Sequence, residues 1–170
     1  MATDDPRTVH ALRASIPQRG LVEQILLSPA RKQPLNSVDT ATVRVGTGLV
    51  GDHHSERRPG GKRQVTLIQS EHVPVIASLS GHPDLAASLL RRNIVLSGIP
   101  VNALRGVRFR IGPDVVLEGT GPCDPCSRME QLLGPGGYNA MRGMGGLTAR
   151  VVDGGEISVG DGVVALGLTD

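Results

Sequence analysis

The two cysteines of this chain, Cys123 and Cys126, are the residues best suited to do chemistry. They lie in residues 121–128 (GPCDPCSR), where Asp124 and Pro125 predict a helix N-cap followed by proline at the first helical position. Cys126 would then lie in the first turn, where free backbone N–H groups and the nearby Arg128 favour a thiolate. Because a thiolate attacks sulfur and binds soft metals, the segment predicts a sulfur or metal site.

The residues alone leave three other interpretations of the pair open. A zinc site needs two further ligands, but the chain has no other cysteine, and the adjacent His53 and His54 would point apart from an extended backbone, so we expect no zinc. A redox dithiol belongs after the strand of a βαβ unit, whereas the preceding strands resemble a hairpin. Alternatively, both cysteines are small buried hydrophobes, with Cys126 on the helical face of Met129 and Leu133.

A second candidate site is the run Asp52, His53 and His54, which follows Gly51 where a predicted strand meets a charged, glycine-rich loop. Binding residues are common in such loops. An aspartate beside a histidine can orient the imidazole or bind a cation. The same residues are equally consistent with a simple turn.

A third candidate is the basic stretch at a predicted helix-to-strand junction, Arg91, Arg92 and Asn93. Its arginines would clamp a phosphate or complement the carboxyl end of the helix. Further along, Arg142 and Gly143 begin a glycine-rich stretch whose backbone N–H groups could approach an anion. That stretch lacks the lysine and the spacing of a P-loop, which argues against nucleotide hydrolysis.

The composition is that of one globular domain: 170 residues, 39% hydrophobic, with a net charge of only +2. Phe109 and Tyr138 are the only aromatic residues, so we expect no nucleic-acid partner, because bases stack on aromatic side chains. No apolar run is long enough to span a membrane, and the first twenty residues are too charged for a signal peptide. We therefore expect a cytoplasmic protein with no membrane partner and a loosely ordered tail over residues 1–19.

The 23 glycines and 12 prolines indicate many short strands joined by tight turns. Strands are predicted over residues 21–27, 41–50, 64–69, 93–96, 107–111, 115–118, 147–152, 156–159 and 163–166. Helices are predicted from residues 70–71, over residues 83–92 and at the cysteine segment. The fold class is therefore mainly β with short helices (α+β), a small antiparallel β-barrel, closed or partly open. Its exposed edge strands would allow a homodimer.

In this order, the motifs resemble the MOSC domain, which forms the carboxyl-terminal module of molybdenum cofactor sulfurases and also occurs as a stand-alone bacterial protein. The resemblance spans roughly residues 20–166, within a single predicted domain of residues 20–170. The matching pieces are Gly51-Asp52-His53-His54, the strand at 64–68 with Glu71-His72, Arg92-Asn93-Ile94, Gly98-Ile99 with Asn102 and Leu104, Gly112, Thr120-Gly121-Pro122, Pro125-Cys126-Ser127-Arg128, Met141-Arg142-Gly143 with Gly146-Leu147, and the closing 154–162.

The resemblance implies a β-barrel fold and selects Cys126 over Cys123, because the family's cysteine follows a proline and precedes a short helix. It implies two uses of that thiol. As a sulfur carrier, Cys126 would accept sulfur as a persulfide from a donor such as a cysteine desulfurase and pass it on. As a ligand, the thiolate would bind the molybdenum of a molybdenum cofactor (molybdopterin).

In the second use, the small anionic cofactor would rest on a wider set of residues. Related domains in reductases of N-hydroxylated compounds work in this way, and that activity is one alternative. Another is a non-catalytic module that binds the pterin or a related anion. Sulfurases carry pyridoxal phosphate on a separate domain that this chain is too short to contain, so we expect none here. The implied cofactor-binding residues are Asp52, His53, His54, Arg92, Asn93, Arg128, Arg142 and Gly143.

Overall fold

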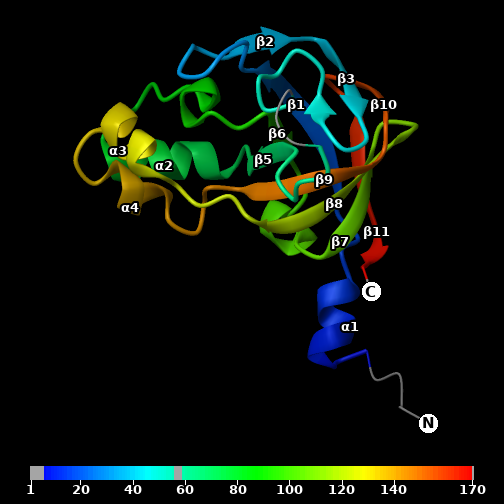
Figure 1. Ribbon diagram of the computed structural model, residues 1–170. Helices are drawn as coiled ribbons and strands as arrows, with labels where there is room; N and C mark the ends of the chain where they lie inside the picture. Colours follow the sequence, from blue (N-terminus) through cyan, green and yellow to red (C-terminus); the bar gives the residue numbers. More distant parts are fainter. Residues whose placement is uncertain (1–5, 56–58, 170) are drawn as a thin grey trace.

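The computed structural model describes residues 6–55 and 59–169, and in that part of the chain seven strands close into a barrel (Figure 1). Their order around the barrel is β11-β7-β8-β9-β5-β6-β1, and β11 pairs with β1 to complete it. The strands are β1 (Arg19–Leu27), β2 (Asn36–Val38), β3 (Thr40–Arg44), β4 (Gly48–Leu49), β5 (Val65–Gln69), β6 (Ile94–Ser97), β7 (Val107–Ile111), β8 (Val115–Pro122), β9 (Leu147–Asp153), β10 (Gly155–Ser158) and β11 (Gly162–Leu168).

The predicted β-barrel is confirmed and is closed, with one departure from an antiparallel arrangement. β5 and β6 are parallel, and the chain crosses between them through α2 (His72–Ser80) and the 3-10 helix η1 (Ala87–Leu90). A parallel pair needs such a crossover, because a short hairpin can join only antiparallel strands. Outside the barrel, β2 pairs with β1, and β10, β3 and β4 form a small separate sheet.

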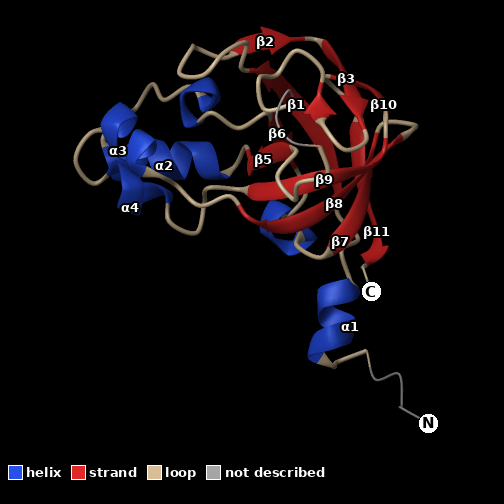
Figure 2. Cartoon of the chain, viewed as in Figure 1, coloured by secondary structure: helices blue, strands red, loops and turns tan. Residues whose placement is uncertain are grey.

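Two apolar clusters hold the fold together, one inside the barrel and one outside it. The inner cluster includes Ile25, Leu67 and Phe109. The outer cluster joins Ile68 of β5 to the helices α2, η1, α3 (Ser127–Leu133) and α4 (Gly137–Met141). Figure 2 shows these helices gathered on one side of the barrel. Because β5 is covered on both faces, residues 65–68 are buried without interruption rather than at alternate positions.

Two predicted elements differ from the structure. The strand expected over residues 41–50 is divided by a turn into β3 and β4, which pair with each other. The helix expected over residues 83–92 is only the four-residue η1, because Arg91 takes a left-handed conformation and ends it. A turn and a 3-10 helix, rather than an α-helix, therefore bury the apolar residues of this segment, among them Ala87 and Leu90.

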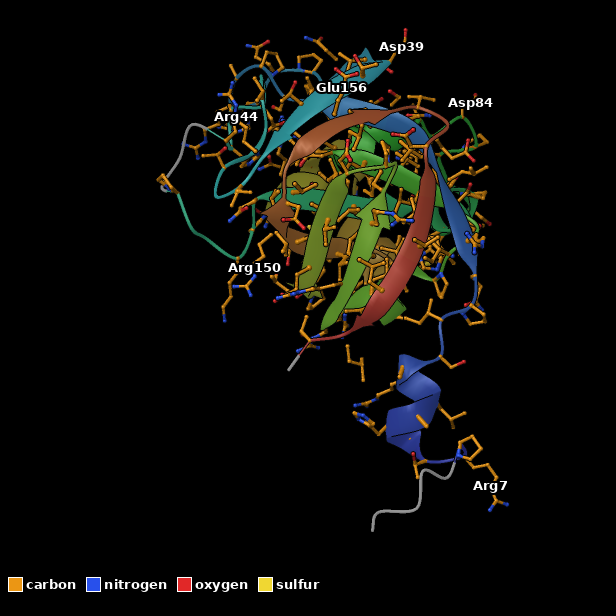
Figure 3. The ribbon with its side chains drawn as sticks, turned by 90° about the vertical axis from the view of Figure 1, so that its right-hand side faces the viewer. Arg7, Asp39, Arg44, Asp84, Arg150 and Glu156 are labelled. Atoms are coloured by element: carbon orange, nitrogen blue, oxygen red, sulfur yellow. The ribbon has the colours of Figure 1, made fainter. Side chains whose placement is uncertain are left out.

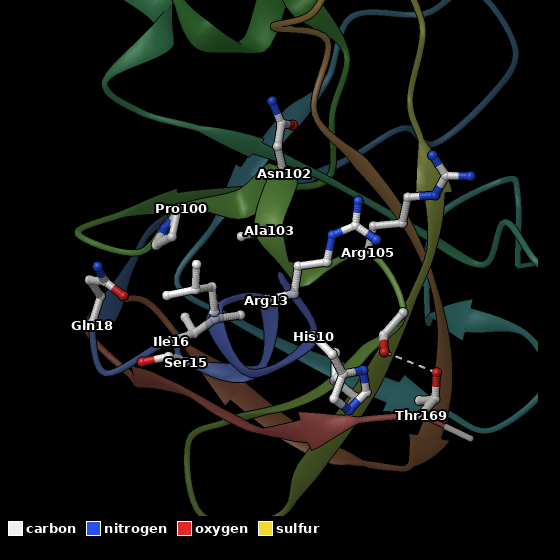
Figure 4. Close-up of a pocket in the computed structure, with 13 residues that line it drawn as sticks. His10, Arg13, Ser15, Ile16, Gln18, Pro100, Asn102, Ala103, Arg105 and Thr169 are labelled. Carbon is white, nitrogen blue, oxygen red and sulfur yellow. Dashed lines mark hydrogen bonds between the residues drawn. The ribbon is translucent and has the colours of Figure 1, made fainter. Parts of the chain in front are cut away.

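The amino-terminal helix α1 (Val9–Ala14) lies within the segment predicted as a tail and projects from one end of the barrel (Figure 3). Thr8 caps it by accepting a hydrogen bond from the N–H of Ala11 at 3.2 Å. A cavity of about 1000 Å³ lies between this helix and the barrel, lined in part by Arg13, Asn102 and Arg105 (Figure 4). Among the described helices, none is long and apolar enough to cross a membrane.

Candidate functional site

The two cysteines lie in the loop between β8 and α3, and they differ sharply in exposure. Cys123 is buried, with 1% of its surface accessible, whereas Cys126 is exposed. The interpretation of both cysteines as buried hydrophobes is therefore wrong for Cys126 and holds only for Cys123. Both thiols are free. Any reagent or ligand arriving from solvent meets Cys126 first.

The predicted start of the cysteine helix is also wrong by two residues. Cys126 itself is the N-cap of α3, in an extended conformation and without a side-chain capping hydrogen bond, so Asp124 and Pro125 precede the helix. Helical bonding begins where the carbonyl of Cys126 accepts the N–H of Met129 at 2.9 Å. The carbonyl of Asp124 instead accepts a hydrogen bond from Arg92, at 3.4 Å.

Arg92 holds the cysteine loop in place through its guanidinium group. Its side chain is buried, with 4% of the residue exposed. It donates from Nη2 to the carbonyl oxygens of Cys123 and Asp124, from Nε to that of Gly145 at 2.7 Å, and from Nη1 to that of Leu90 at 2.8 Å. A guanidinium occupied by four carbonyls is a scaffold for the loop, which is a different task from the predicted phosphate clamp.

Two glycines let a second segment pack directly against Cys123. The N–H of Cys123 donates to the carbonyl of Gly146 at 2.9 Å. A methyl group on Gly145 would overlap the Cys123 carbonyl oxygen, and one on Gly146, at a φ of +95°, would overlap the carbonyl oxygen of Leu67. Only glycine fits this contact, so the glycine-rich stretch serves close packing of the backbone.

A cavity of about 230 Å³ opens on this side of the loop and is lined by Cys123, Gly143, Gly145, Asn102 and Arg105, among others. Asn102 donates from Nδ2 to the carbonyl of Gly143 at 3.0 Å, which ties the cavity wall to the turn after α4. We call this the glycine-lined cavity. The predicted Gly143 lies in its wall, whereas the predicted Arg142 is exposed and does not line it.

The predicted Asp52 is the centre of a buried polar network rather than an exposed ligand. It is 3% exposed, and both carboxylate oxygens are occupied. Oδ2 accepts the N–H of Ser28 at 2.8 Å and Nδ2 of Asn93 at 2.9 Å, while Oδ1 lies 3.0 Å from both the N and Nδ1 of His54. Burial by itself would raise the pKa of Asp52, but the hydrogen bonds from His54 and Ser28 and the charge of His54 lower it below its ordinary value of 3.8.

The two histidines lie closer together than the sequence suggested. The chain turns at this point instead of running extended, so the rings of His53 and His54 have centroids 3.9 Å apart. Their ligand atoms and those of Asp52 all lie within 4.8 Å of one another, a spacing that could hold a cation. Because the oxygens of Asp52 already accept four hydrogen bonds, a cation would have to displace protein donors from them.

Asn93 joins this network to the barrel. Its Nδ2 donates to Asp52 and to the carbonyl of Leu26, and its Oδ1 accepts the N–H and the hydroxyl of Thr66 at 3.1 and 3.0 Å. Arg91, two residues earlier, donates from Nη1 to the carbonyl of Gln33 at 2.7 Å and from Nη2 to Oγ of Ser28 at 3.3 Å. Residues 91–93 therefore connect three separate segments of the chain at the cysteine loop.

The electrostatic surroundings of Cys126 come from arginines on neighbouring elements. Burial lowers the pKa of both Arg91 and Arg92, and a negative charge on Cys126 acts in the opposite direction on each. Arg128, half-buried on α3, further lowers the pKa of Arg91 and donates to the carbonyl of Lys32 at 3.2 Å. Lys32 was not among the predicted site residues, because nothing in the sequence shows that its side chain lies near those of Arg91 and Arg128.

Comparison with known proteins places this geometry in a family context. The model of the MOSC domain matches residues 38–164. Among solved structures, the YuaD protein from Bacillus subtilis superposes with a TM-score of 0.75 at 20% identity, covering 88% of this chain and 97% of that one. YiiM from Geobacillus stearothermophilus superposes with a TM-score of 0.70 at 18% identity, covering 86% of this chain and 75% of that one.

YiiM from Escherichia coli gives a TM-score of 0.65 at 17% identity, covering 86% of this chain and 69% of that one. At these identities, the structural likeness establishes the fold. No curated protein matches the chain.

Proposed function

The chain belongs to the MOSC domain family, and from that premise we propose that it works through the thiol of Cys126, as a sulfur carrier or as a ligand of a molybdenum cofactor. The observation that carries the proposal is the contrast in the cysteine loop. Cys126 is exposed and its charge interacts with that of Arg91, while Cys123 is buried. An exposed thiol is the one that a sulfur donor or a soft metal can reach.

As a sulfur carrier, the Cys126 thiolate attacks the outer sulfur of a donor persulfide. A new S–S bond forms at Cys126, the donor's S–S bond breaks, and the donor's inner sulfur leaves as a thiolate. The sulfur changes carrier without net oxidation or reduction. The positive charge of Arg91, on which a negative charge at Cys126 acts favourably, would stabilise the anionic sulfur before and after transfer.

As a cofactor protein, the chain would use Cys126 as a soft ligand to molybdenum and the glycine-lined cavity to seat part of the cofactor. Two observations support this use: the Cys126 thiol is exposed, and on the Cys123 side of the same loop the cavity wall is backbone without side chains at Gly143, Gly145 and Gly146. The bound metal would supply redox and oxygen-transfer chemistry. Arg92 would contribute indirectly by fixing the loop, since its guanidinium is occupied by carbonyls.

A sulfur-transfer experiment tests the first use. The protein is incubated with a persulfide-loaded cysteine desulfurase, and tryptic peptides are examined by mass spectrometry. We expect a gain of one sulfur atom at Cys126, loss of the adduct in Cys126→Ser, and retention in the matched Cys123→Ser variant. Absence of the adduct from the wild-type protein would rule out the carrier role.

Metal analysis tests the second use. The same three proteins are purified from a host that makes molybdenum cofactor. Molybdenum that is present in the wild type and in Cys123→Ser but absent in Cys126→Ser would identify the ligand. Equal molybdenum in Cys126→Ser would instead support a binding module that does not use the thiol. Reduction of N-hydroxylated compounds is then assayed only in the metal-containing proteins.

A further inference from the structure

The turn that follows β4 holds two imidazoles that the proposed function leaves unused. It spans residues 52–55 and is closed at the carbonyl of Asp52, which accepts the N–H of Ser55 at 2.9 Å and its hydroxyl at 2.7 Å. His53 and His54 are the two central residues, and both are half-buried. The turn brings their rings to a centroid separation of 3.9 Å, with 43° between the ring planes. We call these two side chains the histidine pair.

One nitrogen of each ring is already engaged, and it is the same nitrogen in both. Nδ1 of His53 lies 3.2 Å from the carbonyl oxygen of Ser28, and Nδ1 of His54 lies 3.0 Å from Oδ1 of Asp52. A carbonyl and an ionised carboxylate only accept hydrogen bonds, so each Nδ1 carries the hydrogen. In a neutral imidazole the other nitrogen, Nε2, then holds a lone pair. Neither Nε2 has a hydrogen-bond partner among the described residues.

These hydrogen bonds are of the kind that prepares histidines to bind a transition metal. Metal-binding histidines usually donate their second ring N–H to a carboxylate or to a backbone carbonyl, which fixes the tautomer and the ring orientation. The histidine pair has one acceptor of each kind. The orienting carboxylate is itself held, because Oδ2 of Asp52 accepts from Ser28 at 2.8 Å and from Asn93 at 2.9 Å. Both imidazoles are therefore fixed with Nε2 free.

The spacing of the pair also suits a single ion. One ligand atom from each of Asp52, His53 and His54 lies within 4.8 Å of the other two. Two nitrogens on one tetrahedral zinc ion are about 3.3 Å apart, since each Zn–N bond is about 2.0–2.1 Å long. Rings whose centroids are 3.9 Å apart reach this separation by small side-chain rotations. Asp52 keeps all its hydrogen-bond donors, because it acts behind His54 instead of on the metal.

We propose that His53 and His54 bind one divalent transition-metal ion of the zinc type through their Nε2 atoms, with Asp52 as a positioning residue. Imidazole suits zinc, copper and nickel, whereas magnesium and calcium take oxygen ligands. The sequence argument against zinc assumed that adjacent histidines point apart from an extended backbone, and the turn removes that assumption. Two protein ligands leave the other coordination positions to water, so the ion exchanges readily. The site does not depend on the proposed function of Cys126.

Calorimetric titration of the full chain with zinc tests whether the pair binds a metal. Because an exposed thiol also binds zinc, the titration is made in Cys126→Ser as well as in the wild type. Within Cys126→Ser, His53→Gln and His54→Gln each remove one ligand, and His10→Gln, at an exposed histidine of α1, is the matched control. We expect zinc to bind Cys126→Ser and the control equally, and each pair variant about tenfold more weakly. No zinc binding in Cys126→Ser, or unchanged affinity in both pair variants, overturns the proposal.

Competition between metals distinguishes an imidazole site from a carboxylate site. Copper binds a given nitrogen site more tightly than zinc, so it should displace zinc from Cys126→Ser. Magnesium prefers oxygen ligands, so an excess of it should leave the zinc in place. Displacement of zinc by magnesium would show that the oxygens of Asp52 hold the ion, and it would overturn the assignment to the histidine pair.

Nitrogen NMR of the imidazoles tests the assignment of Nε2 and the positioning role of Asp52. In the wild type we expect both Nδ1 atoms of the pair to carry hydrogen, and zinc to shift both Nε2 resonances. In Asp52→Asn, His54 should populate both tautomers and zinc should bind about tenfold more weakly, while the His53 tautomer stays unchanged as a check on the fold. Zinc that leaves both Nε2 resonances in place overturns the proposal. A wild-type tautomer of His54 and wild-type zinc affinity in Asp52→Asn would overturn the positioning role.

Discussion

Arg91 and Arg92 are neighbours with the same side chain, yet the fold uses them in opposite ways. Arg92 is buried and gives its donors to four carbonyls around the cysteine loop. Arg91 has a strained backbone, lines a groove with Lys32 and Arg128, and donates hydrogen bonds to Gln33 and Ser28. The same division separates the Asp52 network, where each carboxylate oxygen is occupied, from the groove that Lys32, Arg91 and Arg128 line. Groups with satisfied hydrogen bonds build the site, and unsatisfied groups remain available to a ligand.

The largest expected effect comes from removing the scaffold arginine. Arg92→Leu leaves several buried carbonyls without donors and should lower the free energy of unfolding by about 3–5 kcal/mol. Arg91→Leu, its matched neighbour, should cost less than about 1 kcal/mol because its partners are exposed or weakly bonded. Denaturant unfolding of the two variants measures the difference. Equal losses would remove the distinction between the two arginines.

The next effect concerns Asp52 and depends on pH. Asp52→Asn should cost about 2 kcal/mol near neutral pH, because an amide cannot accept from every donor that the carboxylate serves. The pKa of Asp52 is lower in the folded protein than in the unfolded chain, where it is about 3.8. The charge of Asp52 therefore stabilises the fold fully above about pH 3.8, and this stabilisation is lost as the pH falls through the lower pKa of the folded protein. Unfolding measured from about pH 6 to about pH 2.5 should therefore show the two proteins converging at the acidic end. A difference in the free energy of unfolding between the two proteins that stays constant across this pH range would contradict a stabilising role for the charge of Asp52.

A smaller loss of stability is expected from substituting Gly145, which packs against the backbone of Cys123. Gly145→Ala places a methyl group against the Cys123 carbonyl and should cost about 1–3 kcal/mol while exposing Cys123 to thiol reagents. The control is Gly61→Ala, because Gly61 has nothing within 4 Å of the added carbon. Unfolding and the labelling rate of Cys123 are measured together. Full protection of Cys123 in Gly145→Ala would show that the glycine contact does not hold the loop.

The smallest effect on the free energy of unfolding is expected from substituting Lys32, and it has the opposite sign. Lys32→Gly relieves a left-handed conformation, so the free energy of unfolding should be unchanged or raised by up to about 1 kcal/mol. Lys62→Gly, at a position without positive φ, should instead lower it by about 0.5 kcal/mol, because glycine gains freedom in the unfolded chain. A marked loss of stability in Lys32→Gly would show that the lysine side chain supports the fold and would contradict this expectation.

The sequence predicted what short-range patterns determine. Alternating and apolar runs placed the strands of the barrel, and the proline before Cys126 pointed to the exposed cysteine through the family resemblance. The sequence did not predict that the guanidinium of Arg92 would donate all its hydrogen bonds to carbonyls, since those partners lie up to 53 positions away along the chain. Nor could it show the left-handed conformations of Lys32 and Arg91, which tertiary contacts impose. The helix start was misplaced because Asp124, a good N-cap by type, gives its carbonyl to Arg92 instead.

The most direct measurement is the distribution of transferred sulfur between the two thiols of one wild-type sample. After incubation with a persulfide-loaded desulfurase, peptides containing Cys123 and Cys126 are separated and quantified by mass spectrometry. We expect the added sulfur on Cys126 and none on Cys123, because only Cys126 is exposed beside the arginines. Sulfur on Cys123, or on neither cysteine, would contradict the assignment of Cys126 as the reactive thiol.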